Sequence, residues 1–293
     1  MNTTAKPASH RLVRTSDGLD LSVAIWPGTG ESPGVFLMHA TGFVKEVWDP
    51  VVVELHRRGV VGLFAAADQR GHGDSEVPEP PFAWAALGRD VAAVLEALGG
   101  SWIGVGHSSG GAAIAMAQIV SPDLFEALLL IEPIIFPPPH LRIEDHPFAA
   151  LALRRRVFFA DRDDALANFA GKGPFARWDR RALDAYVDGA LRHDGDQLRL
   201  KCDPETEAEF YRTGSGHDAW DHLDSIGVPV TLMVGSDSNS HPASFVGLIE
   251  ERFQDVTVLV VDGATHFVAM ERPDLVADAV FDLIEKVERL QRR

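Results

Sequence analysis

The feature that most constrains this chain is a series of short apolar segments separated by longer amphipathic stretches. Each segment is rich in Val, Leu, Ile and Phe, and it is apolar at consecutive positions instead of at every second one. Such runs are typical of strands buried on both faces of a parallel sheet. The segments are 35–39, 60–67, 102–106, 127–131, 228–234 and 257–261. Their alternation with helical patterns predicts an α/β fold with a mostly parallel, doubly wound sheet.

Helices are predicted between and after these strands. Apolar positions recur at helical spacing in 45–58, 82–98 and 273–290. Pro50 marks a candidate first turn of the first helix, and Gly59 follows its end. At the N-terminus, 10–14 and 19–26 flank an Asp-Gly pair, which predicts a hairpin.

One long region interrupts the alternation of strands and helices. Between about residues 133 and 226 we find several helical patterns but no strand-like run, and a Pro-rich stretch opens the region. We therefore predict a core made of residues 1–133 and 227–293. Residues 134–226 are predicted to form a helical cap, a lid inserted after the sixth strand.

Charge and composition exclude several classes of protein. The 293 residues include 27 Lys+Arg and 43 Asp+Glu, a net charge of −16, which disfavours nucleic acid and anionic membrane surfaces as partners. A single cysteine, Cys202, allows no intrachain disulfide. The N-terminus is polar and no apolar run approaches a membrane span, so we expect a cytoplasmic protein, with a homodimer as an open alternative.

The strongest chemical motif is Gly106-His107-Ser108-Ser109-Gly110, which has the pattern G-x-S-x-G. It follows an apolar strand and precedes a helix rich in small residues, the context that a nucleophile elbow requires. Ser108 is therefore the predicted nucleophile. The amide of Ser109 is one predicted oxyanion donor, and the loop after the 35–39 strand supplies the second, for which we choose Thr41.

A serine nucleophile needs a base, and in this architecture the base comes last along the chain. His266 lies in a loop between the last predicted strand and the last helix, so it is the predicted base. The side chain of His39 is predicted to hold its loop by hydrogen bonds. Seven other histidines are predicted to be solvated loop or cap residues, namely His10, His140, His146, His193, His217, His222 and His241. The spacing of His217 and His222 does not favour zinc, and we predict no metal and no cofactor.

Two carboxylates compete for the role of the acid that orients the base. Asp237 is the only carboxylate in the loop that follows the 228–234 strand. Glu132 follows five apolar strand residues and precedes a proline, so it lies at the carboxyl end of a strand, where sites form in open α/β sheets. The residues alone leave both open.

With these motifs in order, the chain resembles the α/β-hydrolase superfamily over nearly its whole length. The matching segments are HATGF (39–43), DQRGHGDS (68–75), GHSSG (106–110) and DGATHF (262–267). Members with similar segments include carboxylesterases, lipases, cofactor-free haloperoxidases and carbon–carbon bond hydrolases, and HATGFVKEVWDP resembles a subgroup with peroxisomal lipase-like proteins. Some haloalkane dehalogenases of this fold carry their acid after the sixth strand, so the resemblance favours Glu132. A serine nucleophile argues against dehalogenase and epoxide hydrolase chemistry.

The resulting prediction is a serine hydrolase that cleaves a small to medium apolar carboxylic ester. A lactonase or a carbon–carbon bond hydrolase would use the same residues, so both stay as alternatives. A ligand-binding protein without catalysis on the same fold is the non-enzyme alternative.

Overall fold

A single eight-stranded sheet organises the computed structural model, which describes residues 7, 9–28, 33–214 and 216–292. Part of the polar N-terminal stretch, residues 1–6 and 8, lies outside these described residues. The strand order is β1-β2-β4-β3-β5-β6-β10-β11, and all pairs from β4 to β11 are parallel, as predicted. The strands are β1 (Ser9–Arg14), β2 (Asp20–Trp26), β3 (Gly34–Met38), β4 (Phe64–Ala67), β5 (Trp102–His107), β6 (Ala127–Ile131), β10 (Val230–Gly235) and β11 (Val256–Val261). The predicted N-terminal hairpin forms β1 and β2.

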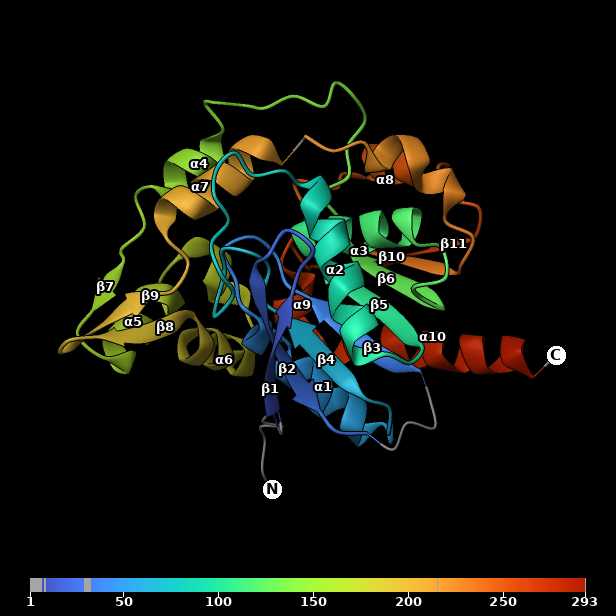
Figure 1. The fold of residues 1–293 in the computed structure, drawn as a ribbon, viewed down its shortest axis with the longest axis horizontal. Coiled ribbons are helices and arrows are strands. Elements are labelled where there is room, and N and C mark those ends of the chain that lie inside the picture. The colour runs from blue at the N-terminus through green and yellow to red at the C-terminus, as the bar shows by residue number, and fades with distance from the viewer. Residues whose placement is uncertain (1–6, 8, 29–32, 215, 293) are drawn as a thin grey trace.

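Helices cover both faces of the sheet, which explains why its central strands β3, β4 and β6 are apolar and buried at every position. One apolar core contains residues of α1 (Asp49–Arg57) and α10 (Pro273–Gln291), and the other contains residues of α2 (Ala85–Leu98), α3 (Ser109–Val120) and α8 (Ala243–Glu250). In β3, Val35 and Leu37 join the first core, whereas Phe36 and Met38 join the second. Figure 1 shows α2 and α3 side by side over the strands. Among the described residues, no helix is long and apolar enough to cross a membrane.

Several predicted elements began too early, among them the helix predicted for 82–98, which begins at Ala85, and the strand predicted for 228–234, which begins at Val230. The strand predicted for 60–67 begins only at Phe64, because the amide of Val60 donates a hydrogen bond back to Leu55 at the end of α1. The helix predicted for 45–58 begins with a 3₁₀ turn, η1 (Lys45–Trp48), and its α-helical part starts at Asp49 with Pro50 in the first turn.

The segment between β6 and β10 contains helices, as expected, and also a small sheet that the sequence patterns did not predict. Its helices are α4 (Pro147–Ala152), α5 (Arg162–Ala170), η2 (Gly173–Arg177), α6 (Arg180–Ala190), α7 (Pro204–Thr213) and η3 (Ala219–Ser225). Strands β7 (Phe158–Phe159), β8 (Leu191–Asp194) and β9 (Gln197–Leu200) form an antiparallel sheet in the order β7-β9-β8. These strands have two to four residues, and half of those residues are exposed, so they lack the apolar run of a buried strand. Most of these elements gather at one side of the main sheet (Figure 1).

The glycines of the GHSSG motif let α3 approach the sheet closely. A Cβ atom added to Gly110 would overlap the carbonyl oxygens of Met38 and His39 at the end of β3. A Cβ atom on Gly106 would overlap the backbone of Gly110 and Gly111. Since these contacts are with backbone atoms, no side-chain movement relieves them.

The replacement Gly110→Ala is expected to lower the free energy of unfolding by about 2 kcal/mol, because overpacking outweighs the better helix propensity of alanine. Urea denaturation followed by circular dichroism measures this change. The matched control is Gly227→Ala, since nothing lies within 4 Å of a Cβ atom added there. Equal unfolding midpoints for the two variants would contradict the close approach of α3 and β3.

Candidate active site

Two strained residues lie at the carboxyl ends of neighbouring strands. Ser108 follows β5 with φ 56° and ψ −117°, and Glu132 follows β6 with φ 49°. They are the two non-glycine residues with positive φ in the described part of the chain. Such conformations cost about 1–3 kcal/mol each and persist only where the surroundings enforce them. Here the amide of Ser108 donates to the carbonyl oxygen of Ile131 at 2.9 Å, and that of Glu132 donates to Met233 at 3.0 Å.

His266 lies between these two residues. It follows β11, and its Nε2 atom is 3.1 Å from Oγ of Ser108. On the other side of the ring, Nδ1 is 3.1 Å from Oε2 of Glu132 and 2.9 Å from Oγ of Ser240. The fold therefore brings Ser108, Glu132 and His266 together from positions up to 158 residues apart in the sequence.

The carboxylate of Glu132 is fully buried and accepts several hydrogen bonds. Its Oε1 atom accepts the amide of Gly235 at 2.8 Å, and Oε2 accepts the hydroxyl of Ser238 at 2.7 Å. Burial by itself raises the pKa of a carboxyl group, but the hydrogen bonds from His241 and His266 outweigh it. Together they hold the pKa of Glu132 well below its usual range, so the group is an anion at neutral pH.

The sequence analysis missed three residues around this carboxylate. Ser238, Ser240 and His241 all follow β10, and each has a polar atom within 2.8 Å of Oε2 of Glu132. The prediction of a solvated His241 is wrong, because this residue is only 2% exposed. The available signal was the position of the loop, since it also contains Asp237, the other candidate acid.

Asp237, the alternative acid, is in a different environment. Its side chain is 53% exposed and lies 3.3 Å from the guanidinium of Arg177 in η2. Asp237 therefore links the loop after β10 to the segment inserted between β6 and β10, while Glu132 occupies the position beside His266.

The two predicted oxyanion donors are buried, Thr41 in the loop after β3 and Ser109 at the start of α3. Thr41 is 7% exposed and Ser109 is fully buried. The side chain of Gln69 contacts both Oγ of Ser109, at 3.0 Å, and the carbonyl oxygen of His39. The amide of Gln69 donates to Nε2 of His39 at 3.0 Å, and burial lowers the pKa of this histidine to about 3. These contacts agree with the predicted role of His39 in holding its loop.

Aromatic rings pack beside His266. The ring of Phe267 lies 5.4 Å from that of His266, and Trp178 lies 6.1 Å from Phe267. Trp178 also packs edge-on against Phe43 of the HATGF loop, at 5.0 Å. His107 lies 5.1 Å from the ring of His266, and burial lowers its pKa to about 3, so it is neutral. One side of the site is therefore apolar.

Glu132, His241 and His266 also have the composition of a metal site, with their ligand atoms within 4.8 Å of one another. The carboxylate–imidazole distances are 2.7 and 3.1 Å. Tetrahedral zinc with bonds near 2.0–2.1 Å needs ligands about 3.4 Å apart. The distances from the Glu132 carboxylate to the two imidazole rings are therefore those of direct contacts through a hydrogen atom, and they are too short for ligands of one zinc ion.

His217 and His222, whose spacing did not favour zinc, do not share a common ligand position in the structure. His217 is 6% exposed, which corrects its prediction as a solvated residue, and its Nε2 atom contacts the carbonyl oxygen of Ile134 at 2.8 Å. His222 instead lies 3.6 Å from Asp218.

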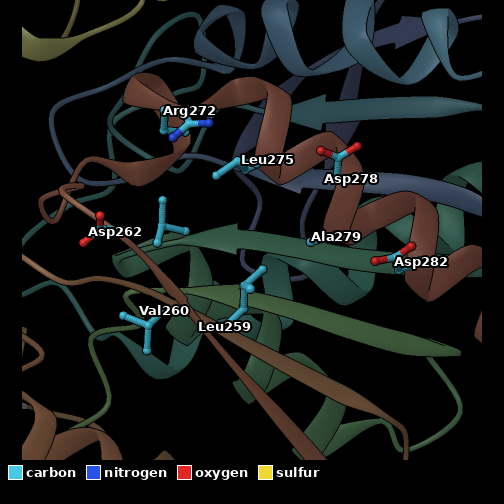
Figure 2. Close-up of a pocket in the computed structure, with 9 residues that line it drawn as sticks. Leu259, Val260, Asp262, Arg272, Leu275, Asp278, Ala279 and Asp282 are labelled. Atoms are coloured by element: carbon cyan, nitrogen blue, oxygen red, sulfur yellow. The ribbon is translucent and has the colours of Figure 1, made fainter.

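A cavity of about 430 Å³ lies on the outer side of the sheet edge, between β11 and α10. Figure 2 shows its lining, which combines the apolar side chains of Leu259 and Leu275 with the charged side chains of Asp262, Arg272 and Asp278. None of Ser108, Glu132 and His266 lines this cavity, and we assign no chemistry to it.

Comparison with known proteins identifies the class. A sequence model of the alpha/beta hydrolase family matches residues 35–279, so the chain belongs to this family. The resemblance and the fold class expected from the motifs are thereby confirmed.

The similar proteins within this family carry different functional names. The chain is 28% identical over 265 residues to 2-(acetamidomethylene)succinate hydrolase of Mesorhizobium japonicum, which covers 87% of this chain and 89% of that protein. It is 24% identical over 283 residues to a peroxisomal membrane protein of Saccharomyces cerevisiae, covering 84% and 73% of the two chains. A solved structure of E-2-(acetamidomethylene)succinate hydrolase matches with a TM-score of 0.79 at 25% identity, over 94% of this chain and 99% of that one.

Removing the charge of Glu132 is expected to destabilise the protein at neutral pH. Since the pKa of Glu132 is lower in the folded than in the unfolded state, its ionised form stabilises the fold above the ordinary value of 4.5, and this contribution is lost as the pH falls. We expect Glu132→Gln to lower the free energy of unfolding by about 3 kcal/mol at pH 7. Urea denaturation of both proteins at several pH values should show the gap narrowing below pH 4.5. A gap that is constant with pH would contradict this account.

Proposed function

We propose that the protein is a serine hydrolase that cleaves carboxylic esters through an acyl-enzyme. In this proposal Ser108 is the nucleophile, His266 the general base and Glu132 the acid that orients His266. The observation that carries it is the position of His266, 3.1 Å from the Ser108 hydroxyl and 3.1 Å from the Glu132 carboxylate.

The proposed reaction has two halves with the same proton carrier. Nε2 of His266 takes the hydroxyl proton as Ser108 attacks the ester carbonyl, and then gives it to the leaving alcohol. Water attacks the acyl-enzyme by the same route in reverse. The amides of Thr41 and Ser109 are the proposed oxyanion donors, and such a donor contributes about 3 kcal/mol.

A neutral, apolar acyl substrate is the proposed class. The rings of Phe267, Trp178 and Phe43 beside His266 favour an apolar group. A partly buried cation, Arg155, lies near Gly42 of the HATGF loop, but its guanidinium is already bound by the carboxylate of Glu207 and donates to the hydroxyl of Tyr186 at 2.5 Å. Because its charge is compensated, Arg155 does not favour a substrate carboxylate.

Two other bond types remain candidates for the same residues. A lactone or a carbon–carbon bond would be cleaved by the same three groups, and the similarity to 2-(acetamidomethylene)succinate hydrolase adds an acetamido-substituted succinate to the panel. A non-catalytic ligand-binding role is the remaining alternative. The cytoplasmic location and the homodimer also stay predictions.

Replacement Ser108→Ala is expected to abolish hydrolysis of p-nitrophenyl acetate, butyrate and octanoate, because no other group at this position supplies the attacking oxygen. Initial rates with purified wild-type and variant proteins measure the effect. Circular dichroism serves as the control for the fold. Equal rates for the two proteins would exclude Ser108 as the nucleophile.

A matched pair of isosteric variants distinguishes which of the two carboxylates, Glu132 or Asp237, acts as the acid. Glu132→Gln is expected to lower kcat by about 10³-fold or more, because the base loses its orienting anion. Asp237→Asn is expected to stay within about twofold of the wild type, because a half-exposed surface pair contributes little. The reverse order of rates would transfer the role of the acid to Asp237.

A further inference from the structure

We propose that His241 is a positioning residue held as an imidazolium beside Glu132, so that His266 acts next to a neutral ion pair. This inference rests on the proposed function, because it concerns how the acid acts on the base. It adds a second histidine to the site, one that touches neither the nucleophile nor the space where a substrate would react.

The two ring nitrogens of His241 both face acceptors. Nδ1 lies 2.7 Å from Oε2 of Glu132, and Nε2 lies 3.1 Å from the carbonyl oxygen of Pro133. A carbonyl oxygen and an ionised carboxylate cannot donate a hydrogen bond. Both nitrogens of His241 must therefore carry hydrogen, which makes the ring positively charged. The ring is 2% exposed, and its charge is balanced by the carboxylate of Glu132.

The other possible positions of the proton fit the contacts less well. Oγ of Ser240 lies 3.1 Å from Nδ1 of His241, but its single hydrogen has a closer acceptor in Oε2 of Glu132, at 2.8 Å. A separation of 2.7 Å between Nδ1 and Oε2 is that of an ion pair between two buried side chains.

His217 provides a contrast within the same molecule. It is also buried, and its Nε2 atom also lies 2.8 Å from a backbone carbonyl, that of Ile134. Its Nδ1 atom, however, accepts the amide of Ala219 at 3.4 Å. One donor and one acceptor describe a neutral ring, and burial accordingly lowers the pKa of His217. His241 differs from His217 because both of its ring nitrogens, and not only one, lie against an acceptor.

A charged His241 alters what Glu132 does to His266. The two histidine rings lie 6.5 Å apart and nearly parallel, with the carboxylate bound to both. Glu132 attracts a proton on His266, whereas a positive His241 repels it. The other rings against His241 are those of Phe136 and Phe245, and the remaining titratable ring beside His266 is the neutral His107. In this proposal the charge of His241 therefore opposes the binding of a proton by His266, the form in which His266 cannot act as a base.

The first test is the pH dependence of kcat/KM for p-nitrophenyl butyrate. In His241→Asn the amide nitrogen keeps a neutral donor near the position of Nδ1, so the positive charge is removed with little change in shape. We expect the acidic limb to move up by about one pH unit, which lowers kcat/KM about tenfold on that limb relative to the variant's own plateau. His217→Asn is the matched control and should leave the limb in place. A loss that is equal at every pH in His241→Asn would overturn the proposal.

The second test needs neither a variant nor a substrate. Wild-type protein labelled with ¹⁵N in histidine is examined by NMR at pH 8, and the ring of His241 is assigned by its contacts with Phe136 and Phe245. Two protonated ring nitrogens on His241, beside one on His217, are the expected result. A neutral His241 ring would overturn the proposal even if the enzyme is active. Absence of serine-dependent hydrolysis would refute the proposed function instead, and the NMR result would still decide the state of His241.

Discussion

The buried carboxylate of Glu132 holds together three parts of the chain that are distant in sequence. An isolated anion in this position would carry a large desolvation cost, and only well-directed donors offset it. The donors come from the end of β10, from the loop that follows it and from the loop after β11. The interaction that orients His266 is therefore also the one that fixes the loops around it. In this structure the stability of the site and its proposed chemistry depend on the same charge.

Strain in the backbone is concentrated at the same place. Ser108 and Glu132 have positive φ angles, and each donates its amide to the neighbouring parallel strand. The register of β5, β6 and β10 thus enforces conformations that isolated segments would avoid. The close approach of α3 at Gly110 adds to this constraint, because it prevents the turn at Ser108 from relaxing. Two strained residues at the carboxyl ends of the central strands β5 and β6 provide the preorganisation that the proposed nucleophile needs.

The loop after β10 contributes donors to the site. Its hydroxyl and imidazole groups surround the carboxylate of Glu132, which follows β6. The carboxylate that remains in the loop, Asp237, points instead to Arg177 at the surface. Together these contacts describe an acid whose charge is shared between two histidines, which is the basis of the inference about His241.

The sequence by itself determined the parallel sheet, the helices on both faces and the elbow at Ser108, because continuous apolar runs and a G-x-S-x-G turn are local patterns with one physical solution. It also indicated His266 through its place after the last strand. It did not predict β7, β8 and β9, whose short, half-exposed strands lack an apolar signal, nor the burial of His241. Only the tertiary structure decided which carboxylate lies beside His266 and which residues share it. Those contacts join strand ends across more than a hundred residues, and hydrogen-bond geometry at such separation leaves no pattern along the chain.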